Sequence, residues 1–418
     1  MRAPTDRPQT APPADTAAVR RHNLALVLRH IAAYGPCART ELAAATGLVH
    51  ASVTGITAEL IERGLVREVG SAATGGRGRP RRLLRVVPER VMAIAVQVTL
   101  ERVEVMVGDL AGTVVHRVSE PHRAPYGSPR PLAAVIAREI ERAAAVVAGY
   151  EGAHLARAVV AMAAPVTGPG HTVPAAIDFG WHRTDLRALV EEHLPSLACP
   201  VDVVNDANVA ALAEYHARIA ATRPSGEAPY TVAYIKADTG VGGGLLIDGR
   251  IHTGSRGMAG EIGHVPLALD GPECRCGARG CLALYVGPEA LATAAGLADL
   301  AAADGLPAAL AELDRRLRAD DPTAVAVLTG AGRTLGAAVL AIWGLTDAGE
   351  VILGGYLATW GRWLLPGIAE ALEGRRAVAD RLEPAIVLGV LGGDATLQGA
   401  LRISREATLD DPTTVPMA

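Results

Sequence analysis

The sequence has a single lysine, few cysteines and no long apolar run. Lys236 is the only lysine, and the five cysteines are not spread as the pairs that a disulfide framework needs. No stretch of about 18 uncharged apolar residues suggests a membrane span. The polar, proline-rich residues 1–15 contain no apolar signal core. We therefore expect a cytoplasmic protein that has no membrane segment.

The chain does have the length for several domains and an uneven distribution of charge. Its 418 residues are 50% hydrophobic, which is ample for sizeable cores. Residues 1–87 contain thirteen Arg and six acidic residues, so they carry 13 − 6 = +7, and the remainder carries −4 − 7 = −11. An arginine-rich composition explains the shortage of lysine but not this segregation. We call residues 1–87 the head and the remainder the body. A basic head joined to an acidic body is typical of a nucleic-acid-binding module attached to an effector domain.

The basic head has the pattern of a helix-turn-helix. Apolar residues recur at helical spacing over 24–31, a second short helix over 40–46 ends at Gly47, and a third apolar stripe covers 53–61. Val49 stands where a polar cap would start the third helix. The exposed face of this helix is predicted to enter the major groove, although small polar residues would also suit a solvated face. The candidate DNA contacts are His50, Ser52, Thr54 and Thr57.

An arginine-rich loop follows the three helices. Residues 65–70 and 83–87 alternate like two strands, and a Gly/Arg/Pro segment lies between them. Such a loop can follow a phosphate backbone or place guanidinium groups in a narrow minor groove. Its arginines are Arg77, Arg79, Arg81 and Arg82. We therefore predict a disordered tail over 1–18 and a winged helix-turn-helix over 19–88 that binds a double-stranded DNA operator.

The body, residues 89–418, alternates strand and helix patterns. Residues 92–96 and 103–107 resemble a strand pair, and 158–162 and 231–235 resemble further core strands. A helical pattern covers 132–147. This alternation predicts an α/β body.

Three cysteines and a histidine form the most distinctive local motif. Cys274, Cys276 and Cys281 fall within eight glycine-rich residues, and His264 lies ten residues before the first of them. Three thiolates and an imidazole suit a closed tetrahedral site for structural Zn²⁺, with chance clustering or a redox role as alternatives. The isolated cysteines are interpreted as small buried apolar side chains, and they are Cys37 and Cys199.

The order of these motifs resembles the ROK family of repressors, open reading frames and sugar kinases. The resemblance rests on residues 261–264 leading into the cysteine cluster, on 205–214, on 239–244 and on the N-terminal winged helix. It covers the whole chain. It implies two actin-like α/β lobes with a sugar cleft between them, a second lobe beginning near 205, and a C-terminal helix that returns to the first lobe.

The resemblance also implies which residues would bind the sugar. In kinases of the family, the aspartate matching Asp206 is the general base. Asn205, Glu261 and His264 match sugar-contacting positions, and the histidine also binds the zinc. A buried carboxylate beside an amide can recognise a polyol through hydrogen bonds, although Asn205 and Asp206 would equally suit a helix cap. Ala283 replaces a glutamate of the family pattern, which alters the sugar site.

The nucleotide side departs from the kinase pattern. Family kinases begin with a D-x-G-x-T phosphate loop, and the matching positions are Gln97, Thr99 and Glu101. Gln97 cannot replace an anionic metal ligand, and Glu101 would repel phosphate. Asp238 adds a second carboxylate directly before the glycine-rich residues 239–244, which are either a phosphate loop or a tight turn.

We therefore predict a sugar-responsive transcriptional regulator, specifically a repressor, whose kinase-like body transfers no phosphate. We expect a homodimer or homotetramer, because two-fold pairing doubles the contacts with a pseudo-palindromic operator. An active or bifunctional ATP-dependent sugar kinase, glucokinase-like and carrying a DNA-binding head, is the alternative. Control by a protein partner instead of a sugar is the third possibility.

Overall fold

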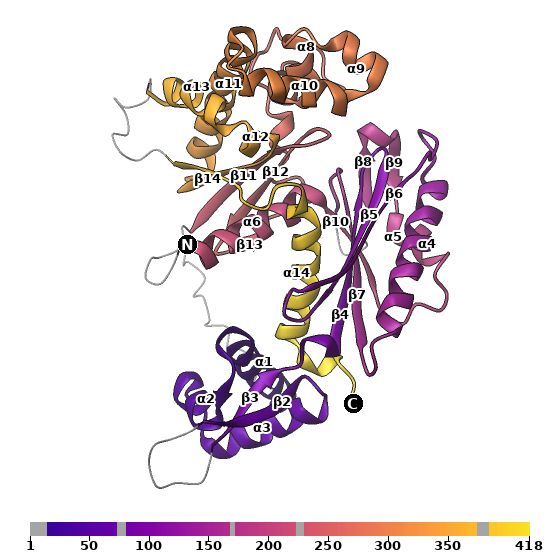
Figure 1. Cartoon of the computed structure of the whole chain (residues 1–418), viewed down its shortest axis with the longest axis vertical. Coiled ribbons are helices and arrows are strands. Elements are labelled where there is room, and N and C mark those ends of the chain that lie inside the picture. The colour runs from indigo at the N-terminus through magenta and orange to yellow at the C-terminus, as the bar shows by residue number, and fades with distance from the viewer. Residues whose placement is uncertain (1–14, 73–80, 168–171, 223–229, 374–383) are drawn as a thin grey trace, which may run out of the picture.

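Residues 15–72, 81–167, 172–222, 230–373 and 384–418 are described by the computed structural model. They form a small N-terminal head, two α/β lobes and a long C-terminal helix that lies between the lobes and reaches the head (Figure 1). The predicted fold class is confirmed.

The three apolar stripes of the head become three helices around one core. Gly47 ends the second helix with a φ of 72°, which glycine adopts without strain, and the chain turns there into the third helix. As predicted, Val49 stands at the start of that helix, where its backbone oxygen accepts a hydrogen bond from Val53 at 3.1 Å. The elements are α1 (Thr16–Tyr34), β1 (Cys37–Ala38), α2 (Arg39–Thr46), α3 (His50–Glu62), β2 (Val66–Ala72) and β3 (Arg81–Val86), with strand order β1-β3-β2.

The first lobe is built on a five-stranded sheet of order β10-β7-β4-β5-β6. β4 is almost entirely buried because α4 covers one face of the sheet and the C-terminal helix covers the other. The strands are β4 (Val91–Val98), β5 (Arg102–Asp109), β6 (Val114–Pro121), β7 (His154–Met162) and β10 (Val201–Asn205); η1 (Pro88–Arg90) precedes them. The remaining elements are α4 (Pro129–Ala148), α5 (Leu186–Glu191) and the hairpin β8 (Val173–Ala176), η2 (Ile177–Phe179) and β9 (Trp181–Thr184).

The second lobe is also built on a five-stranded sheet, of order β13-β12-β11-β14-β15. α6 (Asp206–Thr222) leads into it from the end of β10. Its strands are β11 (Thr231–Ala237), β12 (Val241–Ile247), β13 (Arg250–Ile251), β14 (Glu350–Gly355) and β15 (Ala385–Leu388). Its helices are η3 (Ile262–His264), α7 (Ala283–Val286), α8 (Pro288–Ala294), α9 (Ala298–Asp304), α10 (Leu306–Arg318), α11 (Pro322–Thr346), α12 (Tyr356–Thr359) and α13 (Gly361–Glu373).

The C-terminal helix α14 (Ala395–Asp410), preceded by η4 (Gly392–Asp394), returns to the first lobe and packs on β4 and β7, as predicted. It then continues to the head, which the sequence did not predict. Arg29 of α1 pairs with Glu406 at 2.6 Å and with Asp410 at 2.7 Å. After η5 (Pro412–Thr414), Val415 is buried in the core of the head. α14 therefore connects the lobes directly to the head.

One helix in the described part of the chain, α11, is long and apolar enough to cross a membrane. It packs along α13, and its buried residues belong to the core of the second lobe. A core helix can have the length and apolar composition of a membrane span, and the buried residues of α11 pack in this core.

Candidate functional site

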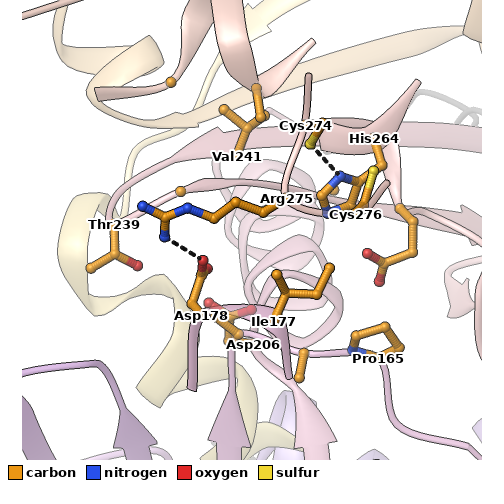
Figure 2. Close-up of a pocket in the computed structure, with 18 of the residues that line it drawn as sticks. Pro165, Ile177, Asp178, Asp206, Thr239, Val241, His264, Cys274, Arg275 and Cys276 are labelled. Carbon is orange, nitrogen blue, oxygen red and sulfur yellow. Dashed lines mark hydrogen bonds and ion pairs between the residues drawn. The ribbon is translucent and has the colours of Figure 1, made fainter. Parts of the chain in front are cut away.

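A cavity of about 510 Å³ lies where β10 of the first lobe ends and α6 of the second begins (Figure 2). Its walls include Asn205, Asp206, Glu261 and His264. The fold thus brings together the four side chains that the sequence predicts around a sugar, although they come from segments separated by more than fifty residues. Apolar side chains such as Pro165 and Ile177 complete the walls, as is usual for a small-molecule pocket.

A buried ion-pair cluster forms the floor of this cavity. The Lys236 ammonium lies 2.7 Å from the Asp206 carboxylate and 3.0 Å from that of Asp238. Burial alone would lower the pKa of Lys236, but the two carboxylates outweigh it and raise this pKa above its usual value. Lys236 is therefore charged. Its position could have been suspected, because the only lysine of the chain interrupts the apolar strand β11.

Asn205 has a structural role in addition to its place in the wall. Its amide nitrogen donates to the Ala164 carbonyl at 3.0 Å, and its amide oxygen accepts from the Asn208 backbone at 2.9 Å. The second contact caps the first turn of α6. One amide hydrogen and one oxygen lone pair remain for a ligand.

Glu261 contributes a carboxylate that makes no hydrogen bond within the described residues. Burial, with a further contribution from the Asp206 carboxylate, raises the pKa of Glu261 to about 7. A ligand hydroxyl would supply the partner that this group lacks.

The predicted metal ligands converge as well. Among His264, Cys274, Cys276 and Cys281, one donor atom from each lies within 4.8 Å of all the others. The Cys276 and Cys281 sulfurs are 3.6 Å apart, and the Cys274 sulfur is 3.7 Å from Nδ1 of His264. A tetrahedral zinc with Zn–S bonds of about 2.3 Å needs sulfur–sulfur edges of about 3.8 Å. Burial lowers the pKa of His264, which favours the neutral imidazole that a metal binds.

The two remaining cysteines lie away from this cluster. Cys37 is buried in the core of the head, as interpreted from the sequence. Cys199 is half-buried against the core of the first lobe, where burial raises the pKa of its thiol to about 11. Both thiols are therefore protonated and unreactive at neutral pH.

A contact that the sequence did not indicate spans the cavity. Arg275, within the cysteine loop of the second lobe, pairs with Asp178 in η2 of the first lobe at 3.4 Å (Figure 2). Both residues line the cavity, and both side chains are substantially exposed. The cysteine loop thus supplies Arg275 to the cavity wall, and η3, which precedes the loop, supplies His264.

The turn at residues 99–102, which matches part of the phosphate loop of the family's kinases, is held by hydrogen bonds between its own residues. The Thr99 hydroxyl lies 3.2 Å from the Arg102 carbonyl and accepts from the Arg102 amide at 3.1 Å. The Thr99 amide also donates to the Arg102 carbonyl, at 3.0 Å. Leu100 is the side chain that this turn places in the cavity wall. Gln97 lies within β4, and Glu101 is exposed at the turn.

The start of α3 presents an exposed polar face. His50, Ser52 and Thr54 are exposed, as predicted for side chains that could reach DNA. The prediction for Thr57 is wrong. Its side chain is fully buried, and its hydroxyl accepts from Arg39 at 3.0 Å and donates to the Thr54 carbonyl at 3.1 Å. One turn further along the helix, position 57 has rotated toward the core.

The wing arginines are only partly described. Arg77 and Arg79 lie outside the described residues, and Arg81 is described only as backbone of β3. Arg82 is exposed and pairs with Glu68 of β2. Its guanidinium stands on the surface of the wing, within reach of a ligand.

Comparison with known proteins agrees with both parts of the molecule. A model of the ROK family matches residues 93–407, and a model of the MarR family matches residues 25–78. The xylose repressor of Bacillus spizizenii is 26% identical over 289 residues, which cover 66% of this chain and 69% of the repressor.

Two solved structures extend the comparison. A ROK family transcriptional regulator, described as a homologue of the E. coli MLC protein, has a TM-score of 0.75 at 22% identity and covers 94% of this chain and 97% of its own. A ROK family glucokinase from Streptomyces griseus, in complex with glucose and AMPPNP, has a TM-score of 0.60 at 26% identity, with coverages of 75% and 99%. The first shares the fold over the head and the body, and the second over the body. The chain belongs to the ROK family and carries a MarR-type winged helix ahead of its ROK domain.

Proposed function

We propose that the protein is a transcriptional regulator, specifically a repressor, that binds a DNA operator through its head and a sugar or sugar derivative through its cavity. The observation that carries this proposal is that α14 contacts the cavity floor at one end and the head at the other. Thr396 at its first turn contacts Lys236 on the cavity floor at 3.4 Å, and Glu406 near its other end pairs with α1 of the head. A ligand in the cavity therefore has a direct physical route to the DNA-binding helices.

The cavity has the chemistry of a sugar site. Asp206 and Glu261 offer carboxylate oxygens to hydroxyl groups, and Asn205 offers both a donor and an acceptor. Apolar walls suit the carbon faces of a sugar ring. The named xylose repressor and the glucose-bound glucokinase support a sugar as the ligand, although they do not identify it.

The same cavity is poorly suited to phosphoryl transfer. A general base must accept a proton from the sugar hydroxyl, but a carboxylate oxygen of Asp206 is already engaged by the Lys236 ammonium at 2.7 Å. The polar groups of the Thr99 turn are hydrogen-bonded to one another and are not available to a phosphate. Asp238 adds a carboxylate beside the glycine-rich loop. We propose that these changes leave a sensor in place of a kinase.

The cysteine cluster is proposed to hold structural zinc. Its donor set and spacing fit a closed tetrahedral site that leaves no open position for chemistry. Bound zinc would cross-link His264 to the cysteine loop and so fix the wall that carries Arg275.

Sugar binding without turnover is the expected behaviour of the purified protein. Calorimetry against a panel of sugars and their phosphates should find one ligand that binds with a stoichiometry of one per chain. The same sugar, incubated with ATP and Mg²⁺, should give no sugar phosphate above the uncatalysed rate, because Asp206 is paired and the first phosphate turn is closed. Turnover that disappears in Asp206→Ala would favour the kinase alternative.

The link between the cavity and α14 gives a second expectation. Thr396→Val keeps the side-chain shape but removes the hydroxyl that contacts Lys236. We expect the sugar to bind nearly as before, while its effect on DNA affinity shrinks by about tenfold or more, since one hydrogen bond to a charged group contributes about 1.5–3 kcal/mol. DNA affinity measured with and without sugar tests this.

Thr408→Val is the matched control for that variant. Thr408 is equally buried in α14, and its hydroxyl donates to the Ser404 carbonyl within the helix at 3.3 Å. It should retain the full sugar effect. Equal loss of the sugar effect in both variants would mean that helix stability, and not the Lys236 contact, carries the signal.

A further inference from the structure

A second polar cluster lies outside the cavity, where the head meets the body. Four basic side chains gather there from three helices: Arg29 of α1, His216 of α6, and Arg402 and Arg405 of α14. Arg402 interacts with Arg29 and Arg405, and His216 interacts with both arginines of α14. The Arg29–Glu406 pair belongs to the route from the cavity to the head that is proposed above, whereas His216, Arg402 and Arg405 have no part in that route.

The acidic groups of this cluster do not balance the basic ones. Glu406 pairs with Arg29 at 2.6 Å and with Arg402 at 3.1 Å, and Asp410 pairs with Arg29 at 2.7 Å. Both carboxylates are therefore already engaged. Within the described residues, Arg405 has neither an ion pair nor a hydrogen bond. Arg29 and Arg402 thus share the two carboxylates, and the positive charge of Arg405 is left over.

Two donors of the cluster are also buried without an acceptor. Nε of Arg402 and Nε of Arg405 are shielded from solvent, and neither has a hydrogen-bond partner in the described part of the chain. A buried guanidinium N–H without an acceptor is costly and rare in native proteins. Its usual explanation is a bound water or ion.

The electrostatics of the neighbouring groups agree with an excess of positive charge. Burial lowers the pKa of Arg402, and Arg405 and Arg29 lower it further against the opposing effect of Glu406. Burial, followed by the Arg402 charge, lowers the pKa of His216 to about 4. The histidine is therefore neutral and can donate or accept one hydrogen bond without adding charge.

We propose that Arg402, Arg405 and His216 form a binding site for a small oxyanion, either free phosphate or the phosphate group of a monoester. A tetrahedral oxyanion has several acceptor oxygens for the unpaired N–H groups, and guanidinium forks match its geometry. Its charge would offset the excess of the cluster. Because Arg29 of the head belongs to the same cluster, a bound oxyanion would strengthen the contact between α1 and α14.

Thermal unfolding of the full-length, zinc-loaded protein tests this site. We expect 20 mM inorganic phosphate to raise Tm by about 2 °C or more relative to chloride at equal ionic strength. Arg405→Gln should lose this increment. In chloride the variant should be as stable as the wild type or more stable, because Arg405 has no partner to lose and repels Arg402. AMP in place of phosphate tells the sources apart, since a larger shift with AMP would assign the site to a monoester.

A matched variant separates the specific effect from general stabilisation by phosphate, which is excluded from protein surfaces. Arg130→Gln removes an exposed arginine that pairs with Glu192 on the first lobe, and it should keep the whole phosphate increment. An equal increment in the wild type and Arg405→Gln would overturn the proposal. So would an Arg405→Gln protein that is destabilised in chloride and responds normally to phosphate, since Arg405 would then be structural.

Discussion

Cys276→Ser is expected to lose its bound zinc and to unfold at a temperature lower by about 10 °C or more. Zinc binding at a closed site contributes directly to the stability of the folded state, since the unfolded chain does not hold the four donors together. Here the donors lie within 4.8 Å of one another and anchor the loop that carries Arg275. Metal analysis of the purified protein and scanning calorimetry measure the two effects.

Cys199→Ser is the control for the zinc experiment. Cys199 is a free, half-buried cysteine outside the cluster, so this variant should retain about one zinc per chain and most of its stability. Full zinc occupancy in Cys276→Ser would rule out the ligand assignment. Loss of zinc without loss of stability would show that the cluster is not a structural site.

Replacing the four wing arginines with alanine is expected to weaken DNA binding on the order of a hundredfold near 0.1 M salt. Each phosphate contact that is lost should also reduce the slope of log K against log salt by about one. The variant combines Arg77→Ala, Arg79→Ala, Arg81→Ala and Arg82→Ala. Fluorescence anisotropy with an operator selected from random DNA, repeated at several salt concentrations, gives both quantities.

The control for the wing removes the same number of positive charges from the body. Arg130, Arg315, Arg318 and Arg333 are exposed and lie on helices of the two lobes, in surface ion pairs. Their replacement should leave both the affinity and the salt slope nearly unchanged. If the wing variant keeps the wild-type salt slope, the wing does not contact the phosphate backbone and α3 alone must account for binding.

Local pattern predicted most of the elements correctly. Apolar spacing located the helices of the head, and strand alternation located the pair β4 and β5, because buried faces impose a period on the sequence. The same argument failed at Thr57. A small polar residue on a short helix gave no signal that its hydroxyl would satisfy Arg39 inside the head. Which side of a helix is buried depends on the elements packed against it. The apolar stripe of a single helix does not define those elements.

The convergence of the site could be predicted only through motifs. The cysteine cluster was found from the types and spacing of its residues, whereas the four cavity residues were assigned through the resemblance to the ROK family. Lys236 was missed as a site residue because one lysine in a strand does not reveal the carboxylates that neutralise it from α6 and from the end of β11. Likewise, the contacts of Arg29 and Thr396 join residues that are far apart in the chain, and no local pattern encodes them.

The most direct test of sugar-responsive regulation is the effect of sugar on operator affinity in Asp206→Ala. In the wild type, the sugar found by calorimetry should change the Kd for DNA by roughly 5–150-fold, which corresponds to a coupling free energy of about 1–3 kcal/mol. Asp206→Ala removes the carboxylate on the cavity floor but does not touch the head. Asp299→Ala, an exposed position on α9, controls for the loss of one negative charge.

The predicted result is that Asp206→Ala binds operator DNA with the wild-type Kd in the absence of sugar and shows no change when sugar is added, whereas Asp299→Ala responds like the wild type. A full sugar response in Asp206→Ala, or no response to any sugar in the wild type, would contradict regulation through this cavity.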